Sequence, residues 1–160
     1  GQGTMFGDLM DEIDAVQLPT DWTFTQAHQY SLMEAVRTYD SVYKEAGAVH
    51  GCALVQPKAD GECEILMFVE DVGRHNAVDA IAGQMWLDGI DGGDKVFYTT
   101  GRLTSEMVIK TAQMGIPVLV SRSGLTRMGW EIAQRVGITM IGRARGKHYL
   151  LFTGAERFSR

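Results

Sequence analysis

The hydrophobic period of this chain changes at a short polar stretch, residues 70–79. Just before it, apolar residues occupy the alternate positions Ile65, Met67 and Val69, which is the period of a β-strand. After Asn76 apolar residues recur every three or four positions as far as Leu87, which is the period of an α-helix. The pattern therefore predicts a strand, a turn and a helix in that order.

The same change of period recurs along most of the chain. Further strands are predicted at 52–56, 95–100, 117–121, 139–142 and 148–153, and further helices at 26–45, 104–114 and 125–136. Residues 1–24 lack a clear period and are predicted to be an irregular lead-in, with Pro19 and Trp22 docking on the body. A hairpin followed by β-α-β units is typical of a three-layer α/β/α sandwich with a mixed sheet. We therefore predict one α/β domain over residues 25–160.

The turn at 70–76 contains more polar chemistry than a plain connection needs. It combines two carboxylates, a glycine, a guanidinium, an imidazole and an amide. In sheets of this kind, ligands bind outside the carboxyl ends of the parallel strands. Arg74 and His75 are therefore candidate residues for binding a polar or anionic ligand. A polar connection without a ligand is the alternative, because such loops are common.

Two later loops occupy equivalent places and have a similar composition. Free backbone N–H groups at a helix start favour an anion, and a nearby guanidinium adds bidentate contacts with phosphate. Thr104 and Ser123 would also suit the N-cap of any helix, so capping alone is an alternative. The candidate ligand-binding residues in these loops are Gly101, Arg102, Thr104, Ser105, Ser121 and Arg122.

A fourth basic cluster precedes the last predicted strand. Residues 101–160 contain 10 Lys and Arg against 3 Asp and Glu, whereas residues 1–100 contain 5 against 17. The cluster would project over the same edge as the three loops, where a compact anion such as phosphate would complement it. A solvated connection is one alternative, and mutual neutralisation of the two halves is another. The cluster consists of Arg143, Ala144, Arg145, Gly146, Lys147 and His148.

Composition excludes several classes of function. The 160 residues are 45% hydrophobic and 22% charged, as in ordinary globular proteins, and no apolar run reaches the roughly 20 residues of a membrane span. The net charge of −5 argues against nonspecific nucleic-acid binding. Cys52 and Cys63 are not spaced as a metal-binding pair, so we expect buried, inert thiols, no metal site and a cytoplasmic setting. The P-loop and zinc deaminase signatures are missing, which leaves an anion site without an evident catalytic group.

Four stretches of the sequence resemble the formate dehydrogenase accessory protein (FdhD/NarQ) family. The resemblance covers roughly residues 25–158, and the element Glu-Asp-Val-Gly-Arg-His at 70–75 is highly specific. It implies a cytidine deaminase-like α/β/α domain that forms a homodimer. The matching stretches are 49–53, 70–79, 100–108 and 142–153.

The resemblance also implies an activity and its partners. Members of the family are sulfurtransferases that take sulfur from a cysteine desulfurase. They deliver it to the molybdenum (or tungsten) bis-pterin guanine dinucleotide cofactor of the formate dehydrogenase apo-enzyme. The family's cofactor-binding segment aligns with residues 143–148, so GDP or GMP should bind there as fragments of the cofactor.

One feature of the family has no counterpart in this chain. The family's sulfur-carrying cysteine lies in a loop upstream of the main domain, and this chain begins at Gly1, about where that loop should end. We therefore expect a fragment with no catalytic residue of its own, which binds the cofactor without transferring sulfur. Two alternatives stay open: a nucleotide-binding hydrolase or deaminase-like enzyme, and a cofactor chaperone without sulfur chemistry.

Overall fold

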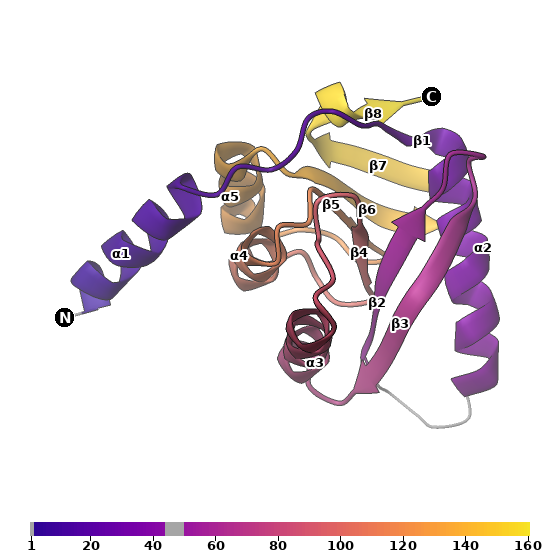
Figure 1. The fold of residues 1–160 in the computed structure, drawn as a ribbon, viewed down its shortest axis with the longest axis horizontal. Helices are drawn as coiled ribbons and strands as arrows, with labels where there is room; N and C mark the ends of the chain where they lie inside the picture. Colours follow the sequence, from indigo (N-terminus) through magenta and orange to yellow (C-terminus); the bar gives the residue numbers. More distant parts are fainter. Residues whose placement is uncertain (1, 44–49) are drawn as a thin grey trace.

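Six strands form one mixed sheet in the computed structural model, which describes residues 2–43 and 50–160 (Figure 1). Their order across the sheet is β3-β2-β4-β5-β6-β7, and β4, β5 and β6 are parallel to one another. The β2–β3 hairpin extends one side of the sheet and β7 the other, both antiparallel to their neighbours. The predicted mixed α/β sheet is therefore confirmed. The strands are β2 (His50–Pro57), β3 (Cys63–Asp71), β4 (Val96–Thr99), β5 (Val118–Ser121), β6 (Thr139–Arg145) and β7 (His148–Thr153).

Helices cover both faces of this sheet. Helices α3 (Arg74–Asp88), α4 (Ser105–Gln113) and α5 (Arg127–Val136) pack on one face, and α2 (Gln26–Tyr43) packs on the other (Figure 1). Alternate residues of a strand point to opposite faces, so each buried strand supplies both cores. In β5, for example, Leu119 joins the core under α3–α5 and Val120 joins the core under α2. The end of this helix predicted at residue 45 lies outside the described residues.

The prediction of an irregular lead-in over residues 1–24 is wrong for its first half, because Gln2–Asp14 forms helix α1. Met10 and Ile13 are buried in the core that includes α4 and α5. Arg135 on α5 donates two hydrogen bonds to the Asp14 carboxylate, at 2.6 and 2.7 Å. The rest of α1 projects from the body in Figure 1. Tertiary contacts at one end thus stabilise a helix that local periodicity does not predict.

The second half of the lead-in docks on the body, as predicted. Trp22 donates its indole N–H to the carbonyl of Gly93 at 2.7 Å. Phe24–Thr25 then forms β1, which pairs in parallel with β8 (Phe158–Ser159) to make a separate two-stranded sheet. This pairing joins segments from opposite ends of the chain, and no local pattern predicts it.

Threonine side chains cap the helices that follow β4 and β5. Thr104 accepts a hydrogen bond from the backbone N–H of Met107, which confirms it as an N-cap. The expected cap of the next helix, Ser123, is wrong, because α5 starts later and Thr126 caps it by accepting from Gly129. The chain passes through an isolated bridge between Leu103 and Leu125 first, which delays the helix.

Gly129 lets α5 pack closely on the loop before α4. A Cβ atom at this position would lie 2.2 Å from the carbonyl oxygen of Leu103, which is far inside van der Waals contact. Gly129→Ala is therefore expected to lower the free energy of unfolding by about 2 kcal/mol, although alanine normally favours a helix by about 1 kcal/mol. Urea denaturation measures the change.

Gly83 in α3 provides the matched control, because a Cβ atom there would meet nothing within 4 Å. Gly83→Ala should leave stability unchanged or raise it by up to about 1 kcal/mol. Equal effects of the two substitutions would show that the contact with Leu103 does not constrain α5.

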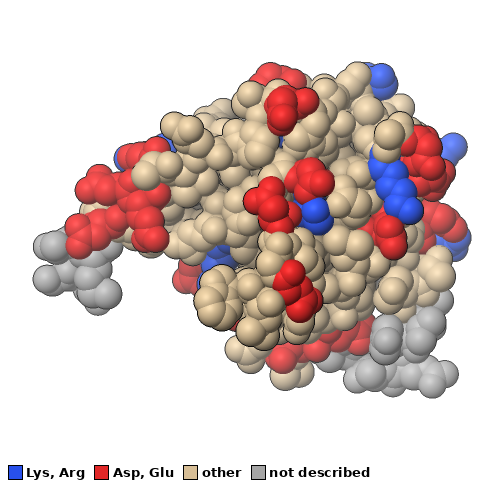
Figure 2. Space-filling view, viewed as in Figure 1, with Lys and Arg blue, Asp and Glu red and all other residues tan. Residues whose placement is uncertain are grey.

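Acidic side chains are spread over α1 and across the face of the molecule drawn in Figure 2, where basic side chains are few and scattered. This agrees with the formal net charge of −5. The face drawn there therefore shows no concentration of positive charge. Within residues 2–43 and 50–160, no helix combines the length and hydropathy needed to cross a membrane.

Candidate functional site

The loops selected from the sequence meet at one edge of the sheet. The parallel strands end level with one another, since Thr99 of β4 pairs with Ser121 of β5. Hydrogen bonds connect the loops beyond them: Ser121 Oγ donates to the carbonyl of Gly101 at 2.5 Å, and Ser123 Oγ donates to that of Thr100 at 2.8 Å. Gly101 and Ser121 are buried and brace the edge, so they are not exposed to a ligand in this structure.

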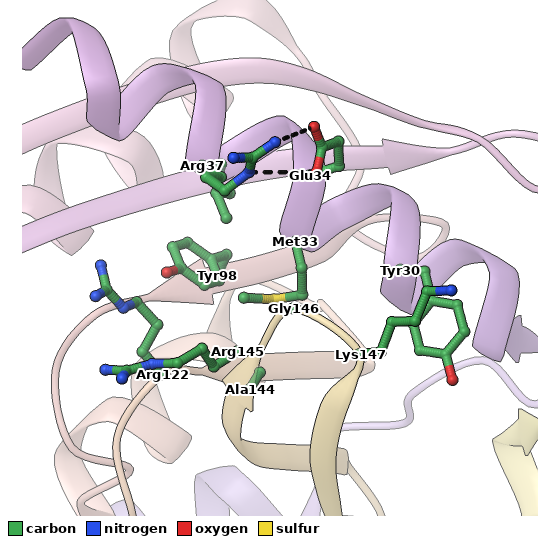
Figure 3. A pocket seen from close by; sticks show the side chains of 11 residues that line it. Tyr30, Met33, Glu34, Arg37, Tyr98, Arg122, Ala144, Arg145, Gly146 and Lys147 are labelled. Atoms are coloured by element: carbon green, nitrogen blue, oxygen red, sulfur yellow. Dashed lines mark hydrogen bonds and ion pairs between the residues drawn. The ribbon is translucent and has the colours of Figure 1, made fainter.

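A pocket of about 470 Å³ opens at this edge, between the sheet and α2 (Figure 3). This volume lies within the range of roughly 300–1,000 Å³ that is usual for small-molecule sites. The sheet side contributes Tyr98, Arg122, Ala144, Arg145, Gly146 and Lys147. Helix α2 contributes Tyr30, Met33, Glu34, Val36 and Arg37.

Basic side chains dominate the charge of this pocket. Arg122 follows β5 and Arg145 ends β6, and Figure 3 shows their side chains at the same end of the pocket. Lys147 lies in the turn after β6, with Nζ 5.7 Å from the centre of the Tyr30 ring. These three side chains are exposed, so they can reach a ligand. Positive charge gathered at a concave, partly apolar surface attracts a compact anion.

The turn that brings Arg145 and Lys147 to the pocket is shorter than predicted. Strand β6 continues to Arg145, where a strand end at Gly142 was expected, because Arg145 pairs with His148 of β7. Gly146 has φ +59°, a conformation that favours glycine in the tight turn. The predicted basic connection is thus a β-hairpin that ends beside α2.

An irregularity in β6 keeps Arg143 out of the pocket that Ala144 and Arg145 line. Arg143 has φ +49°, and the pairing of β6 with β7 shifts register between Gly142 and Arg145. Its guanidinium lies against Gly124, where a Cβ atom would be 2.8 Å from Nη2. Arg143 therefore does not line the pocket, whereas the next residue, Ala144, does. His148 is exposed on β7 and also lies outside the pocket lining.

The remaining candidates lie at the helix starts on the other face of the sheet. Helix α3 begins at Arg74, earlier than predicted, so His75 belongs to its first turn. His75 Nε2 is 3.0 Å from Glu106 Oε2 at the start of α4, beside Thr104 and Ser105. Because α2 covers the opposite face, these residues do not line the pocket. The Arg74 side chain lies outside the described part of the chain.

Both cysteines have unreactive surroundings. Cys52 is buried, and burial raises the pKa of its thiol to about 11. Cys63 is partly buried, and burial, reinforced by the charge of Glu62, raises the pKa of its thiol to about 12. Neither thiol lines the pocket. Among the described residues, the charged lining of the pocket is thus mostly basic and includes no cysteine.

The sequence of this chain matches a known protein family. The sequence model of the FdhD/NarQ family matches residues 1–159, nearly the whole chain. The chain belongs to the FdhD/NarQ family. The sequence resemblance noted for residues 25–158 is thereby confirmed.

Relatives of this FdhD/NarQ chain are named for sulfur handling. The sulfur carrier protein FdhD of Saccharolobus solfataricus is 39% identical over 129 residues, covering 80% of this chain and 49% of the relative. That of Listeria monocytogenes serotype 4b is 34% identical over 145 residues, covering 91% of this chain and 51% of the relative. The chain therefore spans about half the length of the curated relatives it matches.

A solved structure has the same fold as this FdhD/NarQ chain. A Desulfotalea psychrophila protein, assigned as a formate dehydrogenase accessory protein, superposes with a TM-score of 0.78 at 33% identity. The match covers 92% of this chain and 61% of that one.

The α2 wall of the pocket was not predicted from the sequence of this FdhD/NarQ chain. Tyr30, Glu34 and Arg37 recur at helical spacing beside the apolar stripe of α2, and this pattern is also that of an ordinary solvent-facing helix edge. Only the packing of α2 against the distant β6–β7 hairpin makes them part of a site.

Proposed function

We propose that this chain is the cofactor-holding domain of a sulfurtransferase accessory protein for formate dehydrogenase, with a cytidine deaminase-like fold. In this proposal the whole protein receives sulfur from a cysteine desulfurase. The pocket between α2 and the β6–β7 hairpin holds the guanine nucleotide part of a molybdenum (or tungsten) bis-pterin guanine dinucleotide. The names of its relatives and the basic pocket support the proposal.

The residues of the pocket fit the phosphate groups of such a ligand. Arg122, Arg145 and Lys147 approach it from two different segments of the sheet edge. Guanidinium groups bind phosphate oxygens bidentately, and an ammonium adds a point charge. When bound, the cofactor would supply the metal centre that accepts sulfur. The chain's own residues would bind its phosphates and fix its orientation.

The observation that carries the proposal is the convergence of Arg122 and Arg145 at one end of the pocket. GDP should therefore bind the chain, and Arg145→Ala should weaken this binding roughly 10-fold, because one charge-assisted contact with phosphate contributes about 1.5–3 kcal/mol. Calorimetric titration measures both affinities. The exposed Arg145 side chain is not part of the core, so the melting temperature should change little.

Arg127→Ala is the control for this experiment. Arg127 is also an exposed arginine, with 91% of its side chain accessible, but it lies on α5 and outside the pocket lining. Its substitution should leave GDP affinity unchanged. Equal GDP affinities of wild type and Arg145→Ala would show that the β6–β7 hairpin is not part of the binding site.

A further inference from the structure

One acidic side chain lies in the wall of this otherwise basic pocket. Among the described residues that line it, Glu34 is the one carboxylate. A carboxylate repels the phosphates that the neighbouring arginines attract, so a ligand group placed beside Glu34 would have to donate hydrogen bonds. Figure 3 shows Glu34 on α2, on the wall opposite Arg122 and Arg145.

Arg37 holds the Glu34 carboxylate in a defined orientation. Arg37 Nη2 donates to Oε1 at 2.6 Å and Nε donates to Oε2 at 3.3 Å. These hydrogen bonds also lower the pKa of the Glu34 carboxyl, which keeps it ionised. A carboxylate can accept about four hydrogen bonds, so each Glu34 oxygen retains capacity for a further donor. The side chain is 66% exposed and thus open to a ligand.

The floor of the pocket between the two charged walls is apolar. Met33 is 6% exposed there, and Tyr98 and Ala144 lie fully buried beneath it. A ligand with phosphates at Arg122 and Arg145 would place its base over this floor, toward α2.

Guanine presents the donors that this arrangement requires. Its N1–H and 2-amino groups are adjacent donors, which match the two oxygens of a carboxylate. Adenine has an acceptor at N1 and no 2-amino group, so it would place a lone pair against the carboxylate. Hypoxanthine keeps N1–H but lacks the 2-amino group, so it should form only half of the contact.

We propose that Glu34 selects guanine over adenine by accepting hydrogen bonds from N1–H and the 2-amino group, and that Arg37 is its positioning residue. This inference rests on the proposed function, because it assumes a nucleotide in the pocket. It assigns to α2 the recognition of the base and to the sheet edge the binding of phosphate.

The test compares GDP, IDP and ADP by calorimetric titration of the whole chain. Wild type should bind GDP about 10-fold more tightly than ADP, with IDP in between, as expected for one bidentate contact with a base. Glu34→Gln should weaken GDP binding about 10-fold and leave ADP binding nearly unchanged, so that the preference disappears. Arg37→Ala should reduce the preference in the same direction, because the carboxylate loses its orientation.

Glu131→Gln is the matched control. Glu131 is also paired with an arginine on an exposed helix face, at 3.2 Å from Arg127, and lies outside the pocket lining. This substitution should leave all three affinities unchanged.

The outcomes separate this inference from the proposed function. Absence of binding by any nucleotide would overturn both. GDP binding that depends on Arg145, with a GDP-to-ADP ratio unaffected by Glu34→Gln, would overturn only the role of Glu34. If Glu34→Gln instead bound all three nucleotides more tightly by the same factor, the role of Glu34 would also be overturned. Glu34 would then act only by neutralising the charge of Arg37.

Discussion

Arg157→Ala is expected to lower the free energy of unfolding by about 3 kcal/mol or more. Arg157 is only 4% exposed, and its guanidinium joins three segments of the chain. Nε and Nη2 donate to the carbonyl of Pro19 at 2.9 and 2.7 Å, and Nη1 donates to that of Gly137 at 2.9 Å. Burial lowers the pKa of Arg157, but a guanidinium stays protonated in proteins. Alanine would remove the donor of these partly buried carbonyls.

Urea denaturation of Arg157→Ala and Arg157→Lys checks this prediction. Lysine retains the charge but cannot donate in two directions from a planar group, so it should recover only part of the loss. The exposed Arg127 again supplies the control, because its ion pair with Glu131 should contribute less than about 1 kcal/mol. A loss of similar size in Arg127→Ala and Arg157→Ala would contradict the structural role of the buried guanidinium.

The strands and most helices could be predicted from the sequence because their patterns are local. The apolar residues at alternate positions 65, 67 and 69 and the helical spacing up to Leu87 each depend on the residues of one element. Both elements form, although α3 begins earlier than predicted, at Arg74. Helix α1 and the β1–β8 pair were missed for the opposite reason. Burial of Ile13 and the pairing of Phe24 with Phe158 depend on contacts with distant parts of the chain.

The sequence predicted at which edge of the sheet the candidate residues lie. It did not predict on which face of the sheet each of them lies. Strand ends place His75 and Arg145 at the same edge, but α3 and α2 cover opposite faces. The direction in which each loop leaves the edge therefore decides which residues share a pocket. Arg145 meets α2 only because β6 continues past Gly142 into the hairpin. That continuation depends on pairing with β7, which the charge pattern does not reveal.

Neither cysteine is expected to carry sulfur, although the chain belongs to a family with relatives named sulfur carriers. Sulfur transfer and alkylation both need a thiolate. Burial raises the pKa of Cys52 from an ordinary value of 9.0 to about 11 and that of Cys63 to about 12. At neutral pH each thiolate population should therefore be about 100-fold or more below that of an unperturbed thiol.

Alkylation by iodoacetamide should be correspondingly slow in the folded protein and fast in guanidinium chloride. Its rate should rise about tenfold per pH unit and continue to rise above pH 9, because the deprotonated form accumulates only as the pH approaches the raised pKa. Incubation with cysteine and a cysteine desulfurase should add no sulfur to either residue. Mass spectrometry that detects an added sulfur of about 32 Da on Cys52 or Cys63 would contradict this prediction. It would place a sulfur carrier inside the domain, and the pocket between α2 and the hairpin would then lie in the same folded unit as the reacting thiol.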